Sequence, residues 1–250
     1  MKLVRFETLD GRIMPGEADV GTNTIFALSE NGSREAVAQL STTRLHAPCV
    51  PTKIVAVGVN YRAHAAEFGK PVPEEPLLFL KPPSAVIAPE GTIVLPRASQ
   101  LVHHEAELAL VIARYTRRVS AHAARDSVLG FTCFNDVTAR DLQRKDVQFT
   151  RGKGFDTFAP VGPWIETDIN PRDLGLMCRV NGATKQSGRT SDMVWDVYTL
   201  VSYISHVMTL EAGDIITTGT PPGVGPLVAG DRVEIEVDGI GVLGNRCEAE

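Results

Sequence analysis

Cysteine is scarce in this chain and long apolar runs are missing, which excludes two classes of protein. The four cysteines stand at positions 49, 133, 178 and 247, far apart and without a C-x-x-C pair. We therefore expect isolated reduced thiols rather than a disulfide scaffold. The longest apolar run covers residues 108–113, well short of the roughly 20 residues that a membrane-spanning helix needs.

Basic blocks and an apolar leader are missing as well. The formal net charge is −5, and the most basic stretch, residues 114–118, is short and interrupted. Nucleic-acid binding needs a basic stripe that neutralises phosphates, so we expect neither nucleic acid nor a membrane as a partner. The first residues contain no long apolar segment, so a signal peptide is not indicated and a cytoplasmic location is expected.

The composition that remains is that of an ordinary folded chain. Of its 250 residues, 43 % are apolar and 22 % are charged, enough to bury a sizeable core. Short apolar segments separated by turn pairs fill the first 48 residues, and the proline-containing stretch 47–51 is typical of a linker. We predict a small N-terminal β domain over 1–48 and a catalytic metal-binding domain over 49–250.

The larger domain is rich in predicted strands. Apolar runs bounded by turn signals lie at residues 53–57, 77–80, 92–95, 105–114, 129–134, 177–180, 214–218, 233–237 and 241–243. Two helices are predicted, one over 195–208 with Asp192 as its cap and a shorter one over 120–128. The expected fold class is mostly β with a few helices (α+β), built on a curled, mostly antiparallel sheet.

Two carboxylates open the longest predicted strand. Glu105 and Glu107 are two residues apart, so they point to the same face of an extended chain. Carboxylates on one face repel each other, and a cation between them relieves the repulsion. The alternative is a solvated strand face, because charged side chains usually lie on the surface.

A third carboxylate, Asp136, ends an apolar strand. A helical turn capped by Thr138 would place Asp136, Arg140 and Gln143 on one face, in one pocket. The alternative is a simple helix cap with an exposed arginine. Three carboxylates form a hard oxygen site that suits Mg²⁺, Mn²⁺ or Ca²⁺ better than zinc.

Two histidines stand next to these carboxylates. His103 and His104 precede Glu105 directly and could in principle bind zinc. The alternative places one histidine behind the carboxylate ligands and exposes the other. We expect the second arrangement.

A possible general base lies earlier in the chain. His64 and Glu67 are three residues apart on a predicted short helix, so their side chains can touch. A carboxylate bound to one imidazole nitrogen fixes the tautomer and raises the basicity of the other nitrogen. The pair could activate a water molecule, and the alternative is a structural or exposed histidine.

Two glycine-containing segments could contact an anion. Lys153 stands between Gly152 and Gly154, where its ammonium could stabilise a developing oxyanion. Thr220 lies in the segment TGTPPGVG at residues 218–225, which could present its hydroxyl and backbone N–H groups to an anion. For both segments the alternative is a plain surface turn.

These segments, in this order, resemble the fumarylacetoacetate hydrolase family over roughly residues 52–247. The resemblance rests on VGVNY at 57–61, FLKP at 79–82, HEAEL at 104–108, NDVTARDLQ at 135–143, GK at 152–153 and TGTPPGVG at 218–225. It implies a strand-rich roll of mixed sheets that forms homodimers. The N-terminal 48 residues match the family poorly.

The resemblance also implies roles for individual residues. The implied Mg²⁺ or Mn²⁺ ligands are Glu105, Glu107 and Asp136. The implied catalytic residues are His64 with Glu67, which activate water, and Lys153, which stabilises an oxyanion. The implied substrate-binding residues are Arg140, Gln143 and Thr220, together with Lys81 in a matching motif of less defined role.

The expected substrate is a small 2-oxo acid, either a dioxo acid or a hydroxy-diene acid, that reacts through a metal-stabilised enolate. The implied reaction is hydrolysis of a C–C bond, as in acylpyruvate hydrolases, or isomerisation, as in 2-hydroxyhepta-2,4-diene-1,7-dioate isomerases. Decarboxylation of an oxaloacetate-type acid is an alternative. A non-catalytic β module with structural Ca²⁺ would explain the three carboxylates but not His64, Glu67, Lys153 and Gln143 together.

Overall fold

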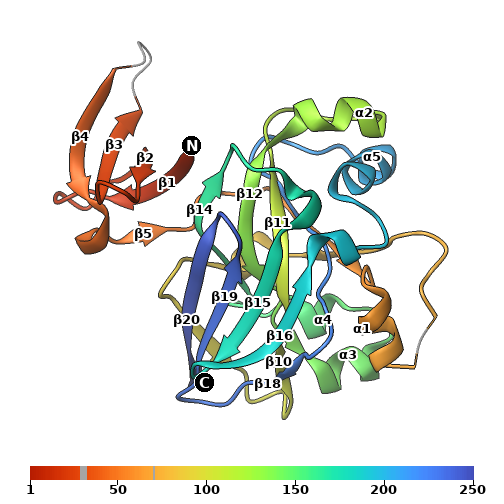
Figure 1. The fold of residues 1–250 in the computed structure, drawn as a ribbon. Coiled ribbons are helices and arrows are strands. Elements are labelled where there is room, and N and C mark those ends of the chain that lie inside the picture. The colour runs from red at the N-terminus through yellow and green to blue at the C-terminus, as the bar shows by residue number, and fades with distance from the viewer. Residues whose placement is uncertain (29–32, 70) are drawn as a thin grey trace.

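The protein is described from a computed structural model that covers residues 1–28, 33–69 and 71–250 (Figure 1). Most strands belong to one large sheet. Its order is β4 (Arg34–Gln39), β3 (Thr24–Leu28), β2 (Ile13–Asp19), β1 (Lys2–Glu7), β14 (Ala159–Glu166), β12 (Val128–Asn135), β11 (Ala106–Ile112), β17 (Ile215–Thr217), β6 (Ile54–Gly58) and β7 (Leu77–Lys81). Two short strands join it, with β5 (Leu45–His46) on β1 and β8 (Val86–Ile87) on β14.

Two smaller sheets complete the fold. The five-stranded sheet runs in the order β16 (Ala183–Arg189), β15 (Gly175–Val180), β19 (Arg232–Val237), β20 (Gly241–Ala249) and β9 (Thr92–Leu95). The three-stranded sheet consists of β13 (Thr138–Ala139), β10 (Val102–His104) and β18 (Gly225–Pro226). The mostly β fold class predicted from the sequence is therefore confirmed.

Strand β11 is buried on both faces and separates two cores. Leu108 and Leu110 pack with Leu176 and Ile235 of the five-stranded sheet. The side chains that alternate with them, such as Ala109, lie in a second core with residues of β6 and β17. Because side chains alternate along a strand, Glu107 shares the face of Ala109, directed away from the five-stranded sheet. The carboxylates thus lie at one end of the second core.

Helices are short and few among the described residues, as predicted. They are α1 (Arg62–Glu67), α2 (Ala121–Ala124), α3 (Arg140–Asp146), α4 (Thr150–Lys153) and α5 (Val197–Val207). In Figure 1, α1, α3 and α4 gather at one end of the sheets, next to β10 and β18. Among the helices of the described residues, none is long and apolar enough to cross a membrane.

The predicted helix cap at Asp192 is wrong. Helix α5 is capped by Asp196, whose carboxylate accepts hydrogen bonds from the N–H groups of Tyr198 and Thr199. Asp192 ends a preceding 3-10 turn instead. The predicted helix over 120–128 is α2 followed by a separate 3-10 turn at Arg125–Ser127, with Ser120 as the cap of α2.

Two central strands lack the apolar pattern by which the other strands were predicted. Strand β14 contains Pro160 and Pro163, and proline normally argues against an interior strand. Its ladder with β12 is accordingly irregular between Phe131 and Cys133. Strand β16 is mostly polar and exposed, so it lacks the apolar alternation that identifies a strand.

The N-terminal strands are joined to the rest of the large sheet. Strand β1 pairs antiparallel with β14, with Lys2 opposite Glu166 and Leu3 opposite Ile165. The ammonium of Lys2 also forms an ion pair with the Glu166 carboxylate. The domain boundary at residue 48 stays a prediction.

Candidate metal centre

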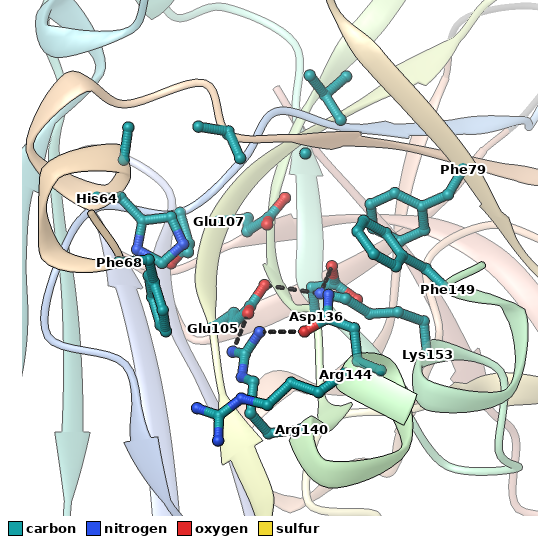
Figure 2. A pocket seen from close by; sticks show the side chains of 16 residues that line it. His64, Phe68, Phe79, Glu105, Glu107, Asp136, Arg140, Arg144, Phe149 and Lys153 are labelled. Carbon is teal, nitrogen blue, oxygen red and sulfur yellow. Dashed lines mark hydrogen bonds and ion pairs between the residues drawn. The ribbon is translucent and has the colours of Figure 1, made fainter. Parts of the chain in front are cut away.

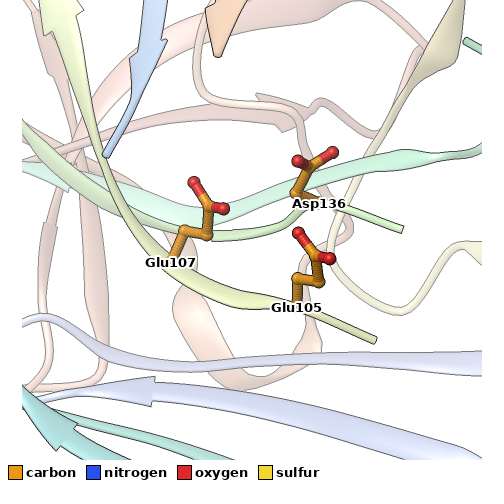
Figure 3. A group of neighbouring side chains, drawn as sticks. All are labelled: Glu105, Glu107 and Asp136. Atoms are coloured by element: carbon orange, nitrogen blue, oxygen red, sulfur yellow. The ribbon is translucent and has the colours of Figure 1, made fainter. Parts of the chain in front are cut away.

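Three buried carboxylates meet at the adjoining ends of β11 and β12 (Figure 3). Ala106 lies opposite Asn135 in this antiparallel pair, so Glu105 and Asp136 are neighbours, and the Asp136 N–H donates to the Glu105 carbonyl at 2.9 Å. One oxygen of each of Glu105, Glu107 and Asp136 lies within 4.8 Å of the others. The three side chains form an all-oxygen cluster of the kind that binds a hard divalent cation.

Cationic side chains pair with two of the three carboxylates, Glu105 and Asp136 (Figure 2). Lys153 Nζ lies 2.8 Å from Glu105 Oε2 and 2.6 Å from Asp136 Oδ2. Lys81 Nζ lies 2.5 Å from Asp136 Oδ1, and the Arg140 guanidinium pairs with Glu105. Burial alone would raise the pKa of Glu105, but Lys153 and Arg140 outweigh it and hold that pKa well below its usual range.

Glu107 lacks such a partner among the described residues. Its carboxylate instead accepts a hydrogen bond from the Gly219 N–H, at 2.9 Å from Oε2. Burial, followed by the charges of Asp136 and Glu105, raises the pKa of Glu107 well above its usual value. A divalent cation among the three oxygens would supply the missing positive charge, so the residues present fit a metal ion.

A small cavity opens on the carboxylates. Its volume is about 130 Å³, below the roughly 300–1,000 Å³ of sites for drug-sized ligands. Figure 2 shows His64 and Phe68 on one side of the carboxylates and Phe79 and Phe149 on the other. The cavity therefore suits a small molecule with both polar and apolar parts.

The predicted contact between His64 and Glu67 is present. His64 Nδ1 lies 3.1 Å from Glu67 Oε2, and His64 lines the cavity. Glu67 Oε1 also accepts the Gly223 N–H at 3.1 Å, which ties helix α1 to the segment 218–225. Because a carboxylate only accepts, Nδ1 carries the proton and Nε2 is left as a basic nitrogen.

The predicted helical face of Asp136, Arg140 and Gln143 is wrong in its local structure. Asp136 precedes β13, and α3 begins only at Arg140, with no side-chain cap from Thr138. The Thr138 hydroxyl instead donates to the Asp136 carbonyl at 2.8 Å. All three side chains nevertheless line the same cavity, and Arg140 Nη1 donates to Gln143 Oε1 at 2.6 Å.

The other predicted residues divide into two groups. Lys153, on α4, and Thr220 line the cavity. Lys81 is fully buried behind Asp136, where it contacts the Asp136 carboxylate and, at 3.2 Å, the Val137 carbonyl. Its contacts are with a proposed metal ligand and not with the cavity.

The two histidines before Glu105 are not part of the carboxylate cluster. His104 Nδ1 lies 2.9 Å from Gln186 Oε1, and burial lowers its pKa. Burial, with the nearby Arg140 charge, lowers the pKa of His103 to about 4. Both rings are thus neutral near pH 7. His104 is held behind the ligands, as expected, whereas His103 is half-buried and not exposed.

Sequence reasoning missed several residues that shape the cavity. Phe68, Phe79, Phe149 and Arg144 line it, and Gln186 lies directly behind it. Arg144 follows Arg140 by one helical turn, a spacing that was available as a signal. Phe79 and Gln186 come from distant strands, and no local pattern marks them.

Comparison with known proteins agrees with this geometry. The family described as fumarylacetoacetate (FAA) hydrolase C-terminal matches residues 53–248. A mitochondrial oxaloacetate tautomerase of Bos taurus is 44 % identical over 208 residues, covering 78 % of this chain and 66 % of that protein.

Two solved structures resemble the whole chain. One is 5-carboxymethyl-2-hydroxymuconate delta-isomerase from Mycobacterium smegmatis, with a TM-score of 0.92 and 45 % identity over 100 % of this chain and 99 % of that one. The other is maleylpyruvate hydrolase from Sphingobium sp. SYK-6 in complex with manganese(II) and pyruvate, with a TM-score of 0.83 and 32 % identity over 100 % and 99 %. The chain therefore belongs to the fumarylacetoacetate hydrolase family and is an enzyme of that family.

Proposed function

We propose that this enzyme uses a divalent metal to move a proton on the carbon next to the 2-oxo group of a small 2-oxo acid. The observation that carries the proposal is one cavity lined by three carboxylates, a basic histidine and a buried ammonium. Its small volume suits an acid of few carbon atoms. The two named relatives of 44 % and 45 % identity are a tautomerase and an isomerase, which supports proton transfer.

The charges of the site favour an anionic substrate. When they are ionised as metal ligands, Glu105, Glu107 and Asp136 carry three negative charges, which the cationic forms of Lys81, Lys153 and Arg140 balance. A divalent cation would thus leave a positive centre, which attracts the carboxylate of a 2-oxo acid. That cation would also polarise the 2-oxo group and acidify the neighbouring carbon.

The chain's own residues would carry the proton and the developing charge. His64 Nε2 takes the proton from the carbon, while Glu67 holds the ring through Nδ1. Lys153 donates two of its three N–H groups to Glu105 and Asp136, so the third is available to the oxygen that gains negative charge. His64 then returns the proton to a different atom, which completes an isomerisation.

Hydrolysis of a C–C bond is the second candidate, because His64 could equally deprotonate a water molecule. The hydroxide would attack the distal carbonyl, the C–C bond would break, and its electron pair would leave with the pyruvate-type fragment as an enolate that then takes a proton. The manganese and pyruvate in the maleylpyruvate hydrolase structure favour this reading. The decarboxylation alternative would use the same enolate without water attack.

The remaining proposals rest on the family resemblance. We propose Mg²⁺ or Mn²⁺ as the ion, since an oxygen-only ligand set suits both. A homodimer is proposed on the same basis, and the cytoplasmic location expected from the sequence is kept as a separate proposal. Light scattering of the purified protein tests the homodimer, and localisation of a tagged chain tests the cytoplasmic location.

A substrate panel tests the function. Oxaloacetate, a hydroxy-diene dioate and an acylpyruvate are each supplied with Mg²⁺ or Mn²⁺, and with a chelator as control. We expect metal-dependent interconversion of the enol and keto forms, followed by ultraviolet absorbance. Cleavage products from the acylpyruvate alone would favour the hydrolase, and pyruvate with carbon dioxide from oxaloacetate would favour the decarboxylase. Equal rates with and without metal would refute the proposal.

A further inference from the structure

One side chain of the five-stranded sheet reaches into the back of the metal centre. Gln186 is the single buried residue of β16, and only 1 % of its surface is exposed. Its Oε1 accepts the Ala106 N–H at 3.0 Å and faces His104 Nδ1 at 2.9 Å. Its Nε2 donates to Thr220 Oγ1 and to the Pro221 carbonyl, both at 2.8 Å. Every hydrogen-bonding position of the carboxamide is therefore used.

The direction of each hydrogen bond is determined by its partners. The Pro221 carbonyl can only accept, so the amide nitrogen of Gln186 faces it, and the Ala106 N–H can only donate, so it meets the amide oxygen. Thr220 accepts from Gln186 and must then donate its own proton to the Ala106 carbonyl, 2.8 Å away. Gln186, Thr220 and the two backbone groups of Ala106 form a closed ring.

The ring lies where β11 loses its neighbouring strand. Strand β17 pairs with β11 only from Ala109 to Val111. Ala106 is completely buried, and beyond the end of β17 its N–H and C=O are satisfied by the Gln186 and Thr220 side chains. These side chains take the place of a strand at the one residue that separates Glu105 from Glu107.

We propose that Gln186 is a positioning residue that fixes the separation of Glu105 and Glu107 and thereby the affinity of the triad for its cation. The inference rests on the proposed metal function. It also assigns the Thr220 hydroxyl to the ring: its proton is committed to Ala106, so Thr220 shapes the cavity without donating to the substrate. Removal of groups that hydrogen-bond the metal ligands themselves typically changes metal affinity about 10- to 100-fold, and we take the same range for this contact with the backbone between two ligands.

Binding of Mn²⁺, followed by the electron paramagnetic resonance signal of the free ion, tests the inference in the full chain. We expect Gln186→Leu to bind Mn²⁺ about 10- to 100-fold more weakly than the wild type. Thr190→Val is the matched control, because the Thr190 hydroxyl is also buried, bonded to Leu174 N and the Pro171 carbonyl, and lies outside the site. It is expected to lower stability and leave Mn²⁺ affinity unchanged. Equal affinity of Gln186→Leu and the wild type overturns the proposal.

Two further variants keep the test decisive if Gln186→Leu does not fold. Thr220→Val breaks the ring without changing Gln186 and is expected to weaken Mn²⁺ binding, whereas Thr220→Ser keeps the hydroxyl and is expected to preserve it. If both variants or neither of them bound Mn²⁺ more weakly, the hydrogen-bonded ring could not be what sets the affinity.

Hydrogen exchange of the Ala106 amide tests the ring independently of metal binding. In metal-free protein, Thr220→Val should accelerate this exchange at least about 10-fold relative to Thr220→Ser. Gln186 accepts the Ala106 N–H, and in Thr220→Val the Gln186 side chain loses its hydrogen bond to residue 220. Unchanged exchange refutes the positioning role. A wild type that fails to bind Mn²⁺ refutes the proposed metal function instead, and the exchange measurement still decides the role of the ring.

Discussion

The ammonium of Lys153 lies 2.6 Å from the Asp136 carboxylate, inside the cluster proposed to bind the metal. Its second carboxylate contact is with Glu105, at 2.8 Å. Burial alone would lower the pKa of Lys153, but Asp136 and Glu105 outweigh it and raise that pKa. In metal-free protein Lys153 therefore limits the repulsion between carboxylates that would otherwise face one another in a buried site.

Replacement of this lysine should separate stability from metal binding. We expect Lys153→Met to destabilise the metal-free protein by about 3–5 kcal/mol, the usual cost of breaking a buried ion pair. Saturating Mn²⁺ should recover much of that loss, because the ion compensates the same carboxylates. Thermal unfolding with chelator measures the loss of stability, and thermal unfolding with Mn²⁺ measures its recovery. An equal loss in the two conditions would contradict the compensating role.

His64→Ala should slow the reaction without unfolding the protein. Removal of a general base typically lowers kcat about 10²- to 10⁴-fold. Glu67→Gln should have a smaller effect, because the amide can still contact Nδ1 but no longer favours the required tautomer. Steady-state kinetics measure both variants. His122→Ala, which changes an exposed histidine on α2, is the control and should match the wild type.

Gly219→Ala should impair the metal centre through the backbone. Gly219 has a φ of +88°, and a Cβ there would lie 2.8 Å from Asn60 Cβ. The left-handed conformation alone costs an ordinary residue about 1–2 kcal/mol, and relief of the contact would move the N–H away from Glu107. We expect weaker Mn²⁺ binding and a lower melting temperature. Gly230→Ala, also left-handed but with open space around its Cβ, is the control and should lose stability only.

Acid should weaken the protein partly through Asp214. Burial alone would raise the pKa of Asp214, but hydrogen bonds from Lys53, the Glu211 N–H and Thr52 outweigh it and lower that pKa. A lowered pKa in the folded state stabilises the protein above the unfolded value of about 3.9, and this contribution is lost as pH falls through the folded pKa.

The variant Asp214→Asn isolates this contribution. It should be less stable than the wild type at neutral pH, and the difference in the free energy of unfolding should shrink below about pH 4. Urea unfolding across this range measures the difference. A difference that stays constant down to about pH 3 would show that other carboxylates cause the acid sensitivity.

The parts of the site that were predicted from sequence depend on short-range periodicity. Glu105 and Glu107 share a face because of strand alternation, and His64 meets Glu67 because of helical spacing. The strands of the larger domain were found for the same reason. The family resemblance supplied the grouping of these segments. The structure places the predicted site residues on one cavity, except Glu67, which contacts His64, and Lys81, which lies behind Asp136.

The parts that were not predicted depend on the packing of distant segments. Lys81 reaches Asp136 across 55 residues, and Gln186 reaches Ala106 across 80. No local pattern states that a lysine will be buried behind a carboxylate or that a glutamine will replace a strand. Strand β14 was missed because its prolines argue against an interior position that tertiary pairing nevertheless imposes.

The position of β17 has a consequence for synthesis of the chain. This strand lies between β11 and β6 in the sheet, although it follows β11 by more than 100 residues, and the Glu107 contact with Gly219 spans 112. A nascent chain on the ribosome therefore cannot close the large sheet or complete the metal centre until nearly all of the protein has emerged. Until then β11 and β6 have unpaired edges, where a chaperone or a second nascent chain could bind.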